Sequence, residues 1–137
     1  MTIEAAGPLD TNVVINLPCL GDSSALPDVP LICTITLAKL SVGSLVAASE
    51  PERAKRQVVL RRVKADFDPL PFDAAAARAF GRVAADLRQA GRKRQAHAYD
   101  ALIAAVALAR NLPVHTGNPA DFEGIGNLRV VAIPITA

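Results

Sequence analysis

Apolar residues change their spacing along the chain, and these changes separate short strand-like segments from longer helix-like ones. Short apolar runs rich in β-branched residues, such as VPLICTI at residues 29–35, predict buried strands. Segments with larger apolar residues at helical spacing, such as residues 36–49, predict helices. The other strands are expected to end near Leu9 and to lie within residues 66–73, 112–116 and 128–135. The other helices are expected to begin near Thr11 and Asp100 and to occupy residues 51–66 and 74–91.

Strand-like and helix-like segments alternate through the chain, and the strands lack a clean alternation of apolar and polar residues. Strands that are apolar on both faces belong to parallel sheets with helices on both sides. A length of 137 residues fits one domain with a sizeable core. We therefore expect a single α/β domain over residues 1–137, with α/β/α layers around a central, mainly parallel sheet.

Composition indicates a globular protein with an aliphatic core. Hydrophobic residues make up 51% and aromatic residues only 4% of the chain, so Ala, Val, Leu and Ile must fill that core. The net charge of +2 is too small to indicate a nucleic-acid partner by itself. Cys19 and Cys33 lack metal-ligand spacing, which favours free thiols in a reducing compartment. With no signal-peptide pattern and no apolar run of about 18 residues, the chain is expected to be cytoplasmic and away from membranes.

Three aspartates fall where predicted strands meet the segments that follow them. Asp10 comes directly after the first strand, Asp100 begins a late helix, and Asp121 follows the strand at residues 112–116. In α/β sheets, ligand sites form outside the carboxyl ends of the strands. Carboxylates beside Asn and Thr side chains provide the oxygen ligands that Mg²⁺ or Mn²⁺ prefers. Such an ion activates water against a phosphodiester, so the pattern favours a metal centre.

Each of these acids also has a purely structural explanation. Asp10 and Asn12 suit the cap of a helix, Asp100 suits the positive end of a helix dipole, and Asp121 suits a turn. Two other functions that use acids on a parallel sheet fit less well. A phospho-receiver domain needs an acidic pair after the first strand, and a dehalogenase-type phosphatase needs Asp where Asn12 stands.

Four segments together resemble VapC-type toxins, the ribonuclease half of bacterial type II toxin–antitoxin pairs, which are built on the PIN domain. The segments are LDTNVVI, TITLAKLSVG, DALIAAVALA and HTGNPADFEGI. The resemblance implies an α/β/α PIN fold and an endoribonuclease that depends on Mg²⁺ or Mn²⁺. It also implies a homodimer and a cognate antitoxin as partner. Carried over to this chain, the catalytic, metal-binding acids are Asp10, Asp100 and Asp121, supported by Asn12, Thr116 and Asn118.

Lys39 breaks this pattern, because VapC-type toxins normally carry Glu at that place in the TLAKL segment. A lysine ammonium has three donors and no lone pair for a metal. Lys39 is therefore expected to pair with Asp10 or Asp100 and to compete with the metal ion. Neither Glu50, eleven residues downstream, nor Glu123 is expected to replace the missing carboxylate.

Two explanations of Lys39 remain open at this point. The residue is either an introduced change that silences a harmful ribonuclease or a natural feature of a degenerate toxin. A weakened enzyme and a catalytically dead PIN scaffold that only binds antitoxin are both compatible with it. Metal-dependent RNA cleavage separates these two functions.

Two basic segments are candidate interaction surfaces. The segment with Arg92, Lys93 and Arg94 leads toward Asp100 and is expected to contact RNA phosphates. The helices between residues 37 and 63 mix apolar and basic positions, so an antitoxin helix with acidic residues is expected to dock there. Both segments also fit a solvated surface. His97 and His115 are isolated and are expected to be structural or minor RNA contacts.

Overall fold

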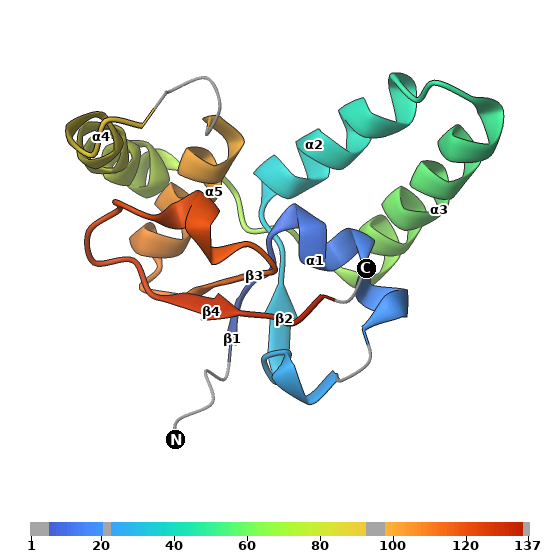
Figure 1. Cartoon of the computed structure of the whole chain (residues 1–137), viewed down its shortest axis with the longest axis horizontal. Coiled ribbons are helices and arrows are strands. Elements are labelled where there is room, and N and C mark those ends of the chain that lie inside the picture. The colour runs from blue at the N-terminus through green and yellow to red at the C-terminus, as the bar shows by residue number, and fades with distance from the viewer. Residues whose placement is uncertain (1–5, 21–22, 93–97, 136–137) are drawn as a thin grey trace.

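The computed structural model describes residues 6–20, 23–92 and 98–135 (Figure 1). The strands are β1 (Ala6–Pro8), β2 (Val29–Leu31), β3 (Val114–Thr116) and β4 (Val130–Ala132). The α-helices are α1 (Thr11–Ile15), α2 (Thr34–Leu45), α3 (Glu50–Asp66), α4 (Ala74–Gln89) and α5 (Ala98–Ala109). The 3₁₀ helices are η1 (Leu17–Cys19), η2 (Ser23–Ala25) and η4 (Pro119–Phe122).

The strands pair in parallel, as expected, but they form two short sheets instead of one continuous sheet. β1 pairs with β2, and β3 pairs with β4. A parallel bridge between Leu9 and His115 joins the two sheets, and the Asp10 N–H donates to the His115 carbonyl at 2.8 Å. The carboxyl ends of β1 and β3 therefore lie side by side.

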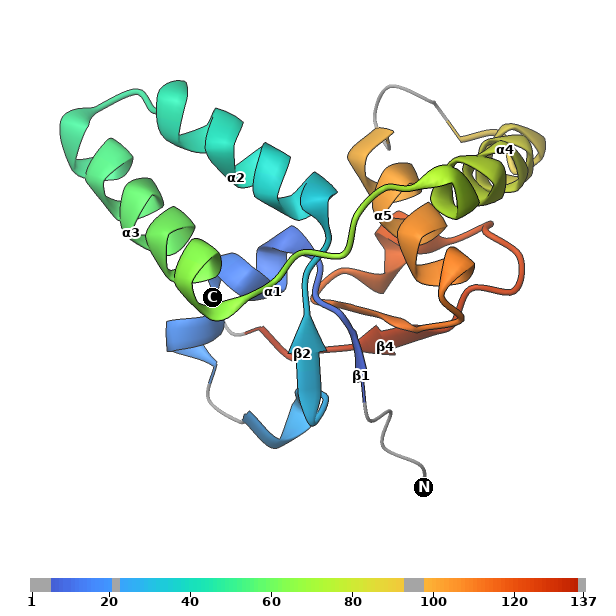
Figure 2. The same ribbon diagram turned by 180° about the vertical axis from the view of Figure 1, so that it is seen from behind.

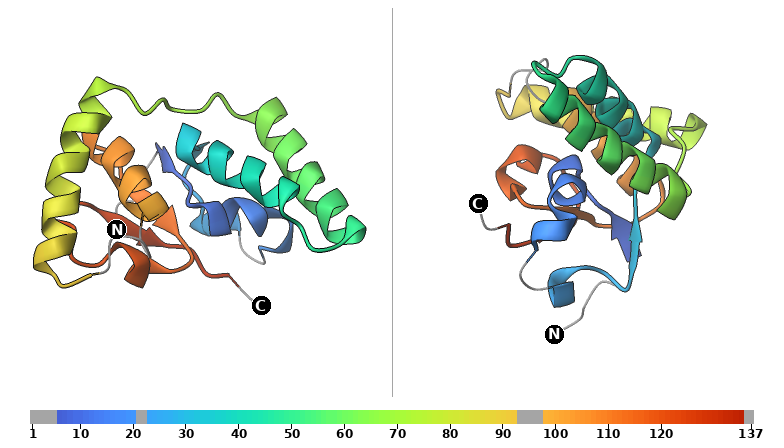
Figure 3. Two further views of the ribbon diagram at one scale, coloured as in Figure 1. Left: turned by 90° about the horizontal axis from the view of Figure 1, so that it is seen from above. Right: turned by 90° about the vertical axis from the view of Figure 1, so that its right-hand side faces the viewer.

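Helices cover both faces of the strands, which confirms the expected α/β/α arrangement. α4 and α5 pack against each other on one face, and α1 lies on the other (Figures 1 and 2). α2 and α3 form a helical hairpin. The view from above shows α3 and α4 at opposite ends of the molecule, with α5 and α2 between them (Figure 3).

α5 is the central helix of the larger of two apolar clusters. Ala101, Ala104 and Ala105 are at most 5% exposed, and their small side chains allow α4 to pack closely on this helix. The second cluster contains fully buried Leu9 and Ile32, under α1 and α2. The aliphatic core expected from composition is confirmed. None of the described helices is both long enough and apolar enough to cross a membrane.

The prediction of a strand within residues 66–73 is wrong. Only a single bridge forms there, between Leu70 and Cys33. The Leu70 N–H donates to the Ile32 carbonyl at 2.9 Å, but Pro69 and Pro71 have no N–H to extend the ladder. The two prolines therefore limit this segment to a crossover between α3 and α4.

The helix expected at residues 36–49 begins earlier and ends earlier than the pattern indicated. α2 starts at Thr34 and stops at Leu45. It cannot continue to residue 49 because Ser49 is extended and caps α3, with its hydroxyl accepting from the Glu52 N–H at 3.3 Å. The cap of α3 therefore excludes Ser49 from α2.

Candidate metal centre

Asp10, Asp100 and Asp121 come together at the carboxyl ends of β1 and β3. Each residue offers one carboxylate oxygen, and these oxygens lie within 4.8 Å of one another. Asp10 follows β1, Asp100 lies in the first turn of α5, and Asp121 lies in η4. Oxygens bound to one Mg²⁺ at about 2.1 Å lie up to about 4.2 Å apart, so small side-chain movements would accommodate the ion. The donor set fits a hard divalent cation.

Asp10 is the most deeply buried of the three acids and is fixed through both carboxylate oxygens. It is 3% exposed, and its Oδ1 accepts from the Thr11 N–H at 2.8 Å as the N-cap of α1. Its Oδ2 accepts from Thr116 Oγ1 at 2.9 Å. Burial raises the pKa of Asp10, while these hydrogen bonds and the charge of Lys39 act in the opposite direction. Capping a helix therefore does not remove Asp10 from the acid cluster.

A relay of hydrogen bonds joins Asp10 to Asp121. The Thr116 hydroxyl, which donates to Asp10, accepts from the Asn118 backbone N–H at 3.0 Å. The Asn118 side-chain amide donates to Asp121 Oδ1 at 3.0 Å. Thr116 and Asn118, both expected as supporting residues, are thus placed to orient the acids.

Asn12 ties α1 to the segment that follows β3. Its Oδ1 accepts from the Gly117 N–H at 3.2 Å. A Cβ at position 117 would collide with the Ile135 side chain, so glycine leaves room for that side chain beside the same backbone. Sequence reasoning missed Gly117, although a glycine directly after a strand is a signal of close backbone contact.

Lys39 influences the acid cluster through its charge. Within the part of the chain that the structure describes, no ion pair involves Lys39. Its Nζ lies 5.6 Å from the centroid of the Tyr99 ring, whose face attracts an ammonium. Lys39 therefore acts on Asp10 through its charge, as expected, but without a direct ion pair among the described residues. Sequence reasoning did not single out Tyr99, which is exposed and directly precedes Asp100.

The basic segment before α5 is only partly described. Arg92 follows α4, and its Nη1 donates to the carbonyls of Ala120 at 2.8 Å and Glu123 at 3.2 Å. The other expected RNA contacts, Lys93 and Arg94, lie outside the described residues, as does His97. His115 lies in β3 and is 1% exposed, so of its two explanations only the structural one fits.

An apolar groove of about 620 Å³ lies between α1, α2 and α3, and Lys39 belongs to its lining. We call it the α1–α3 groove. Its lining includes Ile15, Leu40, Val42 and Val59 together with the cations Lys39, Lys55 and Arg56.

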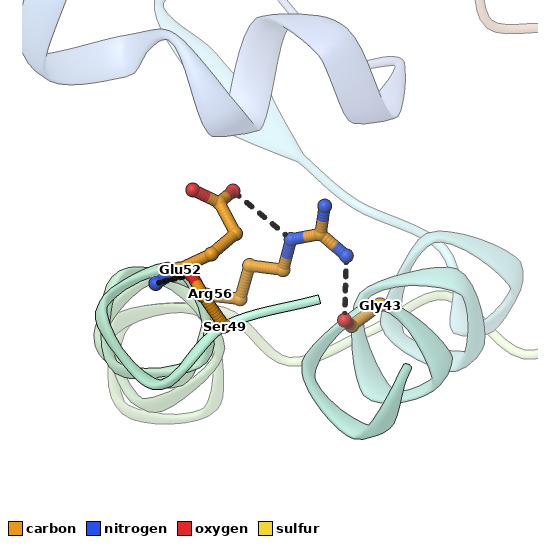
Figure 4. A network of polar contacts seen from close by, with 4 residues as sticks. All are labelled: Gly43, Ser49, Glu52 and Arg56. Atoms are coloured by element: carbon orange, nitrogen blue, oxygen red, sulfur yellow. Dashed lines mark hydrogen bonds and ion pairs between the residues drawn. The ribbon is translucent and has the colours of Figure 1, made fainter. Parts of the chain in front are cut away.

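Arg56 of α3 joins this helix to α2. Its Nε donates to Glu52 on the same helix at 3.2 Å, and its Nη1 donates to the Gly43 carbonyl of α2 at 2.7 Å (Figure 4).

Comparison with known proteins places this geometry in a family. The sequence profile of the PIN domain matches residues 9–126, a range that contains all three clustered acids. The chain is also 38% identical over 136 residues to Ribonuclease VapC5 of Mycobacterium tuberculosis, covering 96% of this chain and 98% of that protein. This chain belongs to the VapC-type members of the PIN-domain family. The resemblance carried by the four sequence segments is confirmed.

Solved VapC-type structures share the fold. The crystal structure of VapBC-5, a member of the VapBC family of toxin–antitoxin systems from M. tuberculosis, matches with a TM-score of 0.79 and 39% identity, covering 94% of this chain and 99% of that chain. A DNA-bound VapBC from Salmonella typhimurium matches with a TM-score of 0.74 and 26% identity, covering 91% and 96%. The tRNA(fMet)-specific endonuclease VapC of Shigella flexneri is 35% identical over 98 residues, which are 72% of this chain and 70% of that protein.

Proposed function

We propose that this VapC-type chain is the toxin of a type II toxin–antitoxin pair and an endoribonuclease that depends on Mg²⁺ or Mn²⁺. The observation that carries the proposal is the convergence of Asp10, Asp100 and Asp121, distant in sequence, within 4.8 Å. Relatives named as ribonucleases, one of them a tRNA(fMet)-specific endonuclease, support RNA as the substrate class. The three acids are the proposed metal ligands.

A divalent cation at this centre would lower the pKa of a water molecule and neutralise charge on the scissile phosphate. The protein's part is to hold three carboxylates together, one of them buried and two partly exposed. Asp10 is fixed by Thr11 and Thr116, and Asn118 orients Asp121. Because burial raises the pKa of Asp10, its ionised form gains strongly from positive charge nearby.

We further propose that Lys39 weakens or abolishes cleavage. Compared with the Glu of the family pattern, it removes one negative charge and adds one positive charge near Asp10. It also offers no oxygen to a metal. Since its ammonium lies over the Tyr99 ring, Lys39 acts through its charge rather than by occupying the space between the acids. The alternative is a catalytically inactive PIN scaffold that only binds antitoxin.

Cleavage of a mixed RNA pool by this chain and by its Lys39→Glu variant, with Mg²⁺, Mn²⁺ or EDTA, tests the proposal. We expect the variant to cleave faster with either ion and EDTA to stop it. Lys55→Glu makes the same charge change in the lining of the same groove and should not activate the protein. Efficient cleavage by the unchanged chain would contradict the role of Lys39. Absence of cleavage by both chains would favour the inactive scaffold.

The α1–α3 groove is the proposed antitoxin surface. Its apolar lining and its cations fit an amphipathic helix with acidic residues. Two of the similar structures are VapBC toxin–antitoxin assemblies. With the cognate antitoxin, Val42→Glu in the groove should prevent co-purification. Val46→Glu, an equal change at an exposed residue just beyond α2 and outside the groove lining, should not.

Homodimerisation is also proposed for this chain. Exposed apolar residues, among them Val29 and Leu45, provide surface that a second copy could cover. Light scattering coupled to size exclusion should give twice the mass of the chain, and a monomeric mass would contradict this part of the proposal.

A further inference from the structure

Arg92 holds the backbone on both sides of Asp121. Its Nη1 donates to the Ala120 carbonyl at 2.8 Å and to the Glu123 carbonyl at 3.2 Å. The Arg92 side chain is only 20% exposed, although it belongs to a segment that looks like a solvated basic patch in the sequence. The contacts of this guanidinium point to the site-bearing loop rather than to solvent.

The end of α4 fixes the place of Arg92. Gly91 has a φ of +75°, and its N–H donates to the Arg88 carbonyl at 3.0 Å. The Arg92 N–H donates to the Leu87 carbonyl at 3.0 Å. These two bonds form a Schellman motif, in which glycine supplies the left-handed residue. The backbone of Arg92 is therefore anchored to α4, while its side chain reaches η4.

Two further contacts join α4 to the same loop. Asp86 Oδ2 accepts from the Gly126 N–H at 2.9 Å. Gly124 has a φ of +91° and packs so closely that a Cβ there would lie 2.9 Å from the Ala90 Cβ. η4 is only four residues long, so tertiary contacts of this kind have to define where it lies.

We propose that Arg92 is a positioning residue for Asp121, and through it for the metal centre, instead of a contact to RNA phosphate. The inference rests on the proposed function, because it takes Asp121 as a metal ligand. Asn118 orients the Asp121 carboxylate at 3.0 Å, and Arg92 holds the backbone that carries it. Loss of partners that orient metal ligands lowers metal affinity by about 10–100-fold.

The test uses the Lys39→Glu chain as parent and measures Mn²⁺ affinity by electron paramagnetic resonance. Arg92→Gln should weaken Mn²⁺ binding about tenfold. Arg92→Lys should restore most of it, because a single nitrogen makes both bonds and an ammonium has three donors. Arg88→Gln removes the same charge from an exposed position of α4 and should change little.

RNA binding in EDTA separates positioning from phosphate contact. Fluorescence anisotropy of a labelled RNA at several salt concentrations should give the same affinity and salt dependence for Arg92→Gln and Arg88→Gln. If Arg92→Gln keeps its Mn²⁺ affinity but loses RNA affinity, with a salt slope smaller by about one, Arg92 contacts phosphate and the inference is overturned.

Amide hydrogen exchange without metal tests the tether independently of the proposed function. Residues 118–126 should exchange at least about tenfold faster in Arg92→Gln than in Arg88→Gln, while α2 and α3 stay unchanged. Equal exchange of residues 118–126 in the two variants overturns the role of Arg92. If the parent binds no Mn²⁺, the proposed metal centre fails, and the exchange rates still decide whether Arg92 holds Asp121.

Discussion

The two sides of the acid cluster are built in different ways. Asp10 is held from within the core, between fully buried Leu9 and buried Thr11, with both carboxylate oxygens hydrogen-bonded. Asp121 is held from the surface, by the exposed side chain of Asn118 and by Arg92. Buried contacts contribute to the stability of the whole fold, whereas surface contacts can open locally. Changes near Asp10 should therefore alter stability and metal binding together, and changes near Asp121 should alter metal binding alone.

The largest effect is expected from Asp10→Ala in the Lys39→Glu background. The change removes a proposed ligand, the N-cap of α1 and the acceptor of the Thr116 hydroxyl. Mn²⁺ affinity should fall by more than about 100-fold, beyond the range for residues that only orient ligands. The free energy of unfolding should fall by about 1–2 kcal/mol, as for other lost caps. Titration calorimetry and urea unfolding measure the two quantities, and an unchanged Mn²⁺ affinity would remove Asp10 from the metal centre.

Thr116→Val should also lower both the free energy of unfolding and Mn²⁺ affinity, with a smaller loss of Mn²⁺ affinity than Asp10→Ala. It deletes the hydroxyl that donates to Asp10 and accepts from Asn118. Leaving the buried Asp10 carboxylate without this donor should lower the free energy of unfolding by about 1–3 kcal/mol, and Mn²⁺ affinity about tenfold. Thr116→Ser keeps the hydroxyl and serves as the control, so both quantities should stay near those of the parent.

Asn118→Ala should lower Mn²⁺ affinity and leave the free energy of unfolding nearly unchanged. The Asn118 side chain touches only the Asp121 side of the cluster and is exposed, so the free energy of unfolding should change by less than about 0.5 kcal/mol. Mn²⁺ affinity should still fall about tenfold. A stability loss as large as that of Thr116→Val would show that the contrast between the two sides is mistaken.

The smallest effect on Mn²⁺ affinity is expected at Asp73, which is not one of the clustered acids. Its variant therefore serves as a reference for the others. Its carboxylate accepts from the Ala76 N–H at 3.0 Å as the cap of α4 and from Arg110 at 3.1 Å, and these contacts lower its pKa. A lowered folded-state pKa stabilises the fold above the unfolded value of about 3.9, and this contribution disappears as the pH falls through the folded value. Asp73→Ala should lower the Tm at pH 7, with a difference that shrinks toward pH 2, and should leave Mn²⁺ affinity unchanged.

The convergence of the acids was predictable from sequence because it depends on strand ends. Asp10 and the segment with Asp121 follow β1 and β3, whose parallel order places both at one edge. The start of α1 after Asp10 and the end of α4 at Gly91 were equally visible, because caps and glycines are local signals. Local rules therefore predicted most of the elements and the edge at which the three acids converge.

The contacts that the sequence did not predict join side chains to helices and loops far along the chain. The ammonium of Lys39 lies over the Tyr99 ring on α5, and no spacing in the sequence reports that contact. The contact of Arg92 with η4 likewise exists only once α4 has packed. The strand expected within residues 66–73 is a different kind of error, because Pro69 and Pro71 were visible signals against it.

The single bridge between Leu9 and His115 also bears on the order of events during folding. Asp10 follows a strand of one small sheet and Asp121 follows a strand of the other, so the acids meet only after segments about a hundred residues apart have paired. Such long-range pairing closes late, because a large loop must lose its conformational freedom first. We therefore expect the helices of a newly made chain to form before the acid cluster assembles. The proposed metal centre exists only after the two sheets have joined.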